Sequence, residues 1–110
     1  MEFDDIVQKM QVRELHMREY YNEDCDDWFT AFAFVVDFEG KRYTFGKQNA
    51  EDWTEGESYA DCLLSEENLL WFIAKYLKTY TQSPYPDADV NNLFYRFGVE
   101  PYGYRVEEIP

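Results

Sequence analysis

Residues 28–45 limit the fold more than any other part of the chain. Positions 31–36 are all apolar, so a strand built from them has two apolar faces, one of which covers a core. Glu39 and Gly40 then provide a tight turn, and residues 42–45 return as a second strand. This segment therefore predicts an antiparallel β-hairpin.

Three segments have apolar residues at helical spacing. Residues 3–10 predict a short first helix. Ser65 is a suitable N-cap for a second, amphipathic helix that extends to about residue 80, because two glutamates follow it where the helix dipole favours negative charge. A third helix is predicted with Asp87 as its cap and Gly98 as its end.

The remaining segments have weaker periodicity. Residues 12–21 fit a helix or a strand, and the strand is favoured because it places Leu15, Met17 and Tyr21 on one face. Residues 48–64 predict a loop with room for one helical turn, and residues 102–107 predict a last edge strand. The expected fold class is α+β: a small antiparallel sheet of three to four strands covered by helices, in the order αβββαα(β), with residues 1–110 forming a single compact domain.

Charge excludes several classes of function. The chain has 10 basic and 23 acidic residues, a formal net charge of −13, which rules out ordinary DNA or RNA binding and disfavours docking on an anionic membrane. Aromatic residues make up 20% of the chain, far more than in disordered acidic proteins, so we expect it to fold.

The negative charge is concentrated in two windows that contain no Lys or Arg. Residues 19–40 and residues 48–74 hold seven acids each, 14 of the 23. Like charges held close together favour the unfolded chain, so the windows are either solvated loops that the fold tolerates or a selected surface. Residues 23–27 carry charges at about 3.3 Å per residue if extended, close to the roughly 3.4 Å between phosphates of one DNA strand.

This similarity indicates an acidic surface that competes with nucleic acid for a basic groove. The candidate partner-binding acids, with two tyrosines that add packing, are Glu23, Asp24, Asp26, Asp27, Glu51, Asp52, Glu55, Glu57, Tyr20 and Tyr21. The alternatives are acids that serve solubility alone and acids that bind a cation.

Catalytic and metal-binding motifs are weak. Asn22, Asp24 and Asp26 follow the start of a calcium loop, but its glycine and its closing glutamate are missing, which leaves only a weak divalent-cation site open. A single histidine, His16, disfavours zinc binding and acid–base catalysis. We therefore expect no enzyme activity, no cofactor and no resident metal.

The sequence favours a cytoplasmic location. The N-terminal residues lack the basic start and apolar run of a signal peptide. The longest apolar stretch, residues 28–36 with Thr30 inside it, is far shorter than the roughly 20 residues that span a bilayer. Cys25 and Cys62 are expected to be free thiols in a reducing compartment, which would be the host cytoplasm if the protein is phage-encoded.

The layout resembles small acidic anti-CRISPR proteins of phages. The resemblance covers about residues 1–80: a start of the form Met-x-x-Asp-Asp-Ile-Val, a charged strand, a long hairpin and a C-terminal helix. It implies a non-enzymatic inhibitor that occupies the DNA-binding cleft of a host defence nuclease such as Cas9 and imitates nucleic acid. No inhibitor residue is carried over from the family.

Two other functions fit the same sequence. An immunity or antitoxin-type protein would block a basic toxin by ordinary protein–protein contact. An adaptor domain would use its acids only for solubility. In each case the partner is a protein rather than nucleic acid or membrane, and the chain is a monomer or a weak homodimer that pairs through the final strand.

Overall fold

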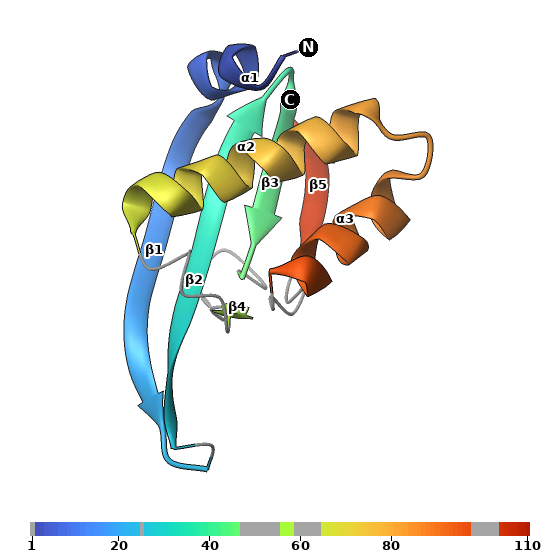
Figure 1. Ribbon diagram of the computed structural model, residues 1–110. Coiled ribbons are helices and arrows are strands. Elements are labelled where there is room, and N and C mark those ends of the chain that lie inside the picture. Colours follow the sequence, from blue (N-terminus) through green and yellow to red (C-terminus); the bar gives the residue numbers. More distant parts are fainter. Residues whose placement is uncertain (1, 25, 47–55, 59–64, 98–103) are drawn as a thin grey trace.

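The computed structural model describes residues 2–24, 26–46, 56–58, 65–97 and 104–110 (Figure 1). It confirms the α+β class: an antiparallel sheet lies beneath a layer of helices, with α2 crossing the strands and α3 beside it. The elements in chain order are α1 (Phe3–Lys9), β1 (Gln11–Asn22), β2 (Asp27–Phe38), β3 (Lys41–Phe45), β4 (Gly56–Ser58), α2 (Glu66–Gln82), α3 (Pro86–Arg96) and β5 (Arg105–Glu108).

The sheet follows the order β1-β2-β3-β5, and all of its pairings are antiparallel. The strand predicted over residues 12–21 is confirmed by β1. The loop predicted over residues 48–64 is wrong at residues 56–58, because β4 pairs there with β2. The rest of that segment lies outside the described residues. The last strand is confirmed at the sheet edge as β5, and residues 102–103 of its predicted range also lie outside the description.

The turn between β2 and β3 has the conformation that its sequence favours. Phe38 pairs with Lys41, so the connection has two residues, Glu39 and Gly40, with φ angles of 49° and 79°. Positive φ at both positions is the type I′ geometry that matches the twist of a hairpin. The Gly40 carbonyl also accepts a hydrogen bond from the N–H of Ile109 at 3.0 Å, which attaches the end of β5 to the turn.

Replacing Gly40 with alanine is expected to lower the free energy of unfolding by about 1 kcal/mol, because an L-residue is strained in this conformation. A Cβ at this position meets no atom within 4 Å, so backbone strain alone determines the loss. Denaturant unfolding measures it. The control Glu39→Asn should unfold no earlier than the wild type, since Asn tolerates positive φ, whereas equal stability of Gly40→Ala and the wild type would contradict the turn geometry.

The helix ends follow capping rules, with one correction. Ser65 caps α2 as predicted: its hydroxyl accepts a hydrogen bond from the N–H of Asn68 at 3.1 Å. The prediction that Asp87 caps α3 is wrong, because the cap is Tyr85 and Pro86 is the first helical residue. Proline starts a helix well, since its φ is already helical and its missing N–H would have no partner there. The predicted end at Gly98 lies outside the described residues, and α3 ends at Arg96.

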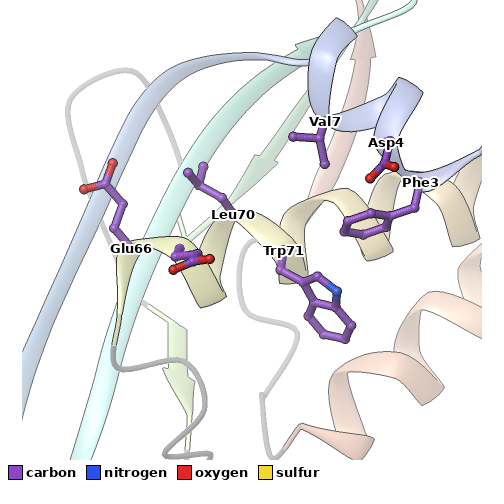
Figure 2. A pocket seen from close by; sticks show the side chains of 7 residues that line it. Phe3, Asp4, Val7, Glu66, Leu70 and Trp71 are labelled. Carbon is purple, nitrogen blue, oxygen red and sulfur yellow. The ribbon is translucent and has the colours of Figure 1, made fainter.

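Helix α1 packs against α2 at one end of the sheet. Ile6 of α1 is fully buried. The ring of Phe3, also on α1, lies 6.1 Å from the indole of Trp71 on α2, measured between centroids (Figure 2). Because Lys9 ends the helix two residues before β1 begins, α1 also fixes where that strand enters the sheet.

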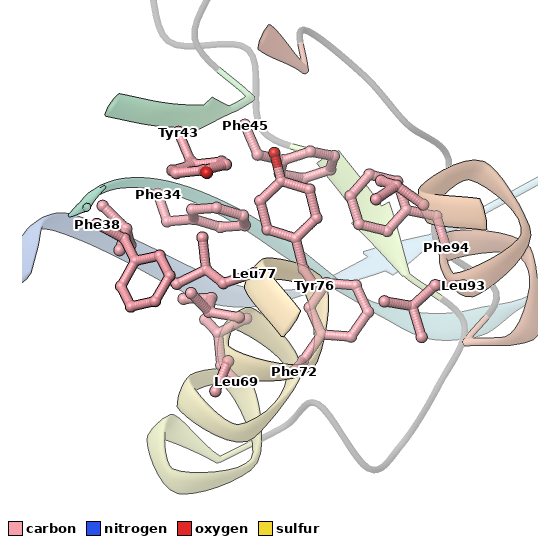
Figure 3. Close-up of a cluster of buried hydrophobic side chains, with 14 of the residues drawn as sticks. Phe34, Phe38, Tyr43, Phe45, Leu69, Phe72, Tyr76, Leu77, Leu93 and Phe94 are labelled. Carbon is pink, nitrogen blue, oxygen red and sulfur yellow. The ribbon is translucent and has the colours of Figure 1, made fainter. Parts of the chain in front are cut away.

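The core consists mainly of aromatic rings from the sheet and the two long helices (Figure 3). Phe34 of β2 lies 5.9 Å from Tyr76 of α2, and Phe72 of α2 lies 5.5 Å from Phe94 of α3. Each buried aromatic side chain removes a large apolar area from water, and offset or edge-to-face pairs add roughly 1 kcal/mol each. This core packs the sheet against the helices, so the parts of β1 and β2 that extend beyond the sheet start from a well-packed region.

Candidate functional site

The β1–β2 hairpin extends past the rest of the sheet. β3 pairs with residues 34–38 of β2, and β4 pairs with residues 30–32. Within the described residues, the last three pairs, which end at Asn22 and Asp27, join β1 and β2 alone. At about 3.4 Å per residue they carry the turn about 10 Å beyond β4. We call residues 20–29 the arm, and Figure 1 shows it projecting beyond the layer of helices.

The tip of the arm presents four carboxylates. Glu23, Asp24 and Asp26 lie in the turn, Asp27 begins β2, and all four residues are exposed. Asp26 has a φ of 53°, a left-handed conformation that Asp and Asn adopt more readily than most residues. Because residues 20–29 contain no Lys or Arg, the arm has a formal charge of −4.

An aromatic pair lies next to these carboxylates. Tyr21 and Trp28 are opposite each other in the register, with ring centroids 5.6 Å apart in an edge-to-face arrangement. The Tyr21 hydroxyl donates a hydrogen bond to the Asp26 carboxylate. The backbone N–H of Trp28 donates one to the Asp27 carboxylate at 2.8 Å. The two aromatic residues nevertheless remain 45% and 61% exposed. The arm therefore carries oriented apolar area beside its charge.

The structure brings some of the predicted residues together. Glu23, Asp24, Asp26 and Asp27 share the tip with Tyr21. The backbone of Tyr20 pairs with Phe29 inside the arm, and the backbone of Glu57 in β4 pairs with Ala31, close to the base of the arm. The other three predicted acids lie outside the described residues: Glu51, Asp52 and Glu55.

The predicted spacing of the tip charges is wrong. An extended run over residues 23–27 would have matched the phosphate spacing of a DNA strand, but residues 23–26 reverse the chain direction between β1 and β2. A turn gathers its side chains at one end of the hairpin and does not line them up. The tip is thus a set of charges at one end of the hairpin and not a linear array along an extended strand.

The first acidic window is also divided between the two ends of β2. Asp37 and Glu39 lie at the end opposite the tip, and Asp37 is buried. Its carboxylate accepts hydrogen bonds from Arg13 at 2.7 Å and from Arg42 at 2.8 and 3.0 Å. The hydrogen bonds from Arg42, and then the one from Arg13, hold the pKa of Asp37 below its ordinary value of 3.8, against the opposing effect of burial. Asp37 therefore belongs to the internal packing and not to the acidic surface.

Trp28 is the arm residue that sequence reasoning missed. It begins the apolar run over residues 28–36, which predicts a strand and not a binding surface. A signal was present, since Trp28 directly follows two aspartates and lies outside the continuous apolar stretch at positions 31–36. Tryptophan is among the residue types that most often dominate binding energy at protein interfaces. Because Trp28 is exposed, its side chain is available for such a contact.

The described part of the chain holds no group of three or more His, Cys, Asp or Glu side chains arranged to bind a metal ion. His16 occupies an exposed position of β1, while Cys25 and Cys62 lie outside the description. Among the described helices, none has the length and apolar character needed to cross a membrane.

No family model, curated protein or solved structure matches the chain. The resemblance to small acidic anti-CRISPR proteins thus stays a prediction. What the structure itself contributes is a projecting arm with four exposed carboxylates and an exposed aromatic pair.

Proposed function

We propose that this protein is a non-enzymatic inhibitor that acts in the cytoplasm by inserting its arm into the basic nucleic-acid-binding cleft of a nuclease. The observation that supports this most strongly is the tip: four exposed carboxylates, no basic residue, and a position about 10 Å beyond β4. A host defence nuclease of the kind blocked by anti-CRISPR proteins is the proposed partner.

The charge of the tip favours entry into such a cleft. Basic clefts that bind nucleic acid hold anions from solution, and an anionic protein that displaces these anions gains entropy from their release, an effect similar in kind to the release of cations from DNA. Since a two-stranded ribbon is narrow, it can reach into a groove that the broader face of the sheet and its helices does not enter. In the proposed complex, the tip occupies the position of a few clustered phosphates.

The aromatic pair supplies the contact that charge alone does not. Long-range electrostatics raise the association rate, whereas buried aromatic anchors slow dissociation. Tyr21 and Trp28 lie beside the carboxylates, so both effects act at one small surface. Salt should therefore weaken the complex without abolishing it.

Recovery of the partner tests the proposal. The immobilised protein is incubated with an extract of its natural cytoplasm and washed at graded salt. The bait with amide substitutions at the tip should lose the partner at lower salt than the wild-type bait. Its substitutions are Glu23→Gln, Asp24→Asn, Asp26→Asn and Asp27→Asn.

A matched bait separates local charge from total charge. It carries the same number of amide substitutions at exposed acids far from the tip, and it should retain the partner as the wild type does. Its substitutions are Glu2→Gln, Asp5→Asn, Asp87→Asn and Glu108→Gln. Equal loss from both baits, or recovery of a partner without a nucleic-acid-binding cleft, would contradict the proposal.

The exposed Trp28 also supports a second candidate, an immunity or antitoxin-type protein that neutralises a basic toxin by ordinary contact. In that case, Trp28→Ala should weaken binding by roughly 30-fold, as expected for the loss of an aromatic anchor. Stability should change by less than about 1 kcal/mol, since only an exposed cross-strand pair is lost. Binding and thermal unfolding of the variant measure both. A complex that depends on Trp28 but is insensitive to salt and to DNA would favour the second candidate over the first.

A further inference from the structure

A groove with an apolar floor lies between α1 and the first turns of α2 (Figure 2). It has a volume of about 590 Å³, within the range of ligand pockets in proteins. The groove lies at the opposite end of β1 from the arm, because α1 leads directly into the start of that strand. Its lining residues are Phe3, Asp4, Val7, Glu66, Glu67, Leu70 and Trp71.

The apolar part of the groove is held in place by aromatic contacts. The Trp71 indole lies 6.1 Å from the ring of Phe3 and 5.7 Å from the ring of Phe97, measured between centroids. Despite these contacts, Trp71 is 44% exposed, and Val7 is 41% exposed. An indole fixed by its neighbours and open to solvent loses little conformational entropy when a partner covers it.

The charged residues that the structure describes at the rim of the groove are all acidic. Asp4 is in the first turn of α1, Glu66 and Glu67 are in the first turn of α2, and all three residues are exposed. Among the described residues that line the groove, none is basic. An anionic ligand would be repelled here, and a neutral apolar ligand would leave the carboxylates without partners. Cationic groups satisfy both the carboxylates and the open face of the indole.

We propose that this groove binds a cationic peptide segment of a partner protein, with one apolar side chain on Val7, Leu70 and Trp71 and flanking Lys or Arg side chains at the acidic rim. The apolar side chain provides the buried contact and the basic side chains provide orientation. This site does not depend on the arm, so a negative result for the arm as a nuclease inhibitor leaves the proposal for the groove unchanged, and the reverse also holds.

A capped peptide, Lys-Lys-Leu-Phe-Leu-Lys-Lys, is the probe. In a chain carrying Trp28→Phe and Trp53→Phe, Trp71 is the remaining tryptophan, and its fluorescence reports on the groove alone. Addition of the peptide should shift the Trp71 emission to shorter wavelength with saturation, because the peptide removes water from the indole. Amide-resonance shifts in the wild-type protein provide the same readout if these substitutions disturb folding.

Two variants that each remove three charges test the location. Asp4→Asn with Glu66→Gln and Glu67→Gln should weaken peptide binding by roughly tenfold, as expected for the loss of three exposed ion pairs. The matched control, at exposed acids outside both the groove and the arm, should bind the peptide as the wild type does. That control carries Glu39→Asn, Asp87→Asn and Glu108→Gln.

Two further peptides test the chemistry. The peptide with Glu in place of Lys and the peptide with Ser in place of Leu and Phe should both fail to saturate the signal. The proposal is overturned if the basic peptide leaves Trp71 and the α1 and α2 amides unchanged, if the groove variant binds as tightly as the wild type, or if the acidic peptide binds equally well.

Discussion

Neutralising the four carboxylates of the tip is expected to weaken binding to the partner nuclease by about 100-fold at low salt, taking about 0.7 kcal/mol for each partly exposed charge pair. The substitutions are isosteric amides at Glu23, Asp24, Asp26 and Asp27. Asparagine also suits the positive φ of position 26, so the turn should keep its shape. Equilibrium titration of wild type and variant against the nuclease measures the difference.

The effect should depend on ionic strength in a defined direction. Because the lost interactions are electrostatic, the difference between variant and wild type should shrink as salt is raised. Thermal unfolding serves as the control: removing four like charges from one turn should leave stability unchanged or increase it. A variant that is folded and binds as tightly as the wild type at low salt would contradict the role of the tip.

Replacing Asp37 with alanine is expected to produce the largest loss of stability among the acidic residues of the described structure, about 2 kcal/mol. The carboxylate is buried and holds Arg13 of β1 and Arg42 of β3 through three hydrogen bonds, so it connects three strands. The loss is moderate because both arginines are about half exposed, and water replaces part of the interaction that they lose. Denaturant unfolding measures the loss, with Glu108→Ala as an exposed control that should change stability by less than about 0.5 kcal/mol.

The same carboxylate predicts a dependence on pH. Its pKa is lower in the folded protein than the ordinary value of 3.8, so its contribution is complete well above pH 3.8 and is lost as the pH falls toward the folded pKa. The stability difference between wild type and Asp37→Asn should therefore be constant near neutral pH and should decrease below about pH 4. A difference that stays constant down to pH 2 would contradict the ion-pair geometry.

The elements with strong periodicity were predictable from sequence. The continuous apolar run at residues 31–36 and the Glu39-Gly40 pair predict the β2–β3 hairpin. The Ser65 cap and the amphipathic segment that follows it predict α2. These signals are local, so no knowledge of distant residues is needed to interpret them. By contrast, β4 consists of Gly-Glu-Ser and has no apolar alternation; it exists because β2 offers a free edge beyond β3.

The candidate site was predictable in composition but not in shape. The concentration of acids near residue 25 is visible in sequence, whereas the turn that bunches them depends on the register of two 12-residue strands. The pairing of the Asp37 carboxylate depends in part on Arg13, which is 24 residues away in sequence and approaches Asp37 only when β1 pairs with β2. Charge windows counted along the chain therefore overstate the acidic surface, because they do not distinguish exposed acids from paired ones.

Competition between this protein and DNA for the nuclease tests the central claim most directly. A fluorescently labelled duplex is bound to the purified nuclease, and its apparent dissociation constant is measured at increasing concentrations of the protein. If the arm occupies the nucleic-acid cleft, that constant should rise linearly with the protein concentration, and the tip variant should require about 100-fold more protein for the same rise. Formation of a ternary complex in which the duplex binds with unchanged affinity would contradict the account.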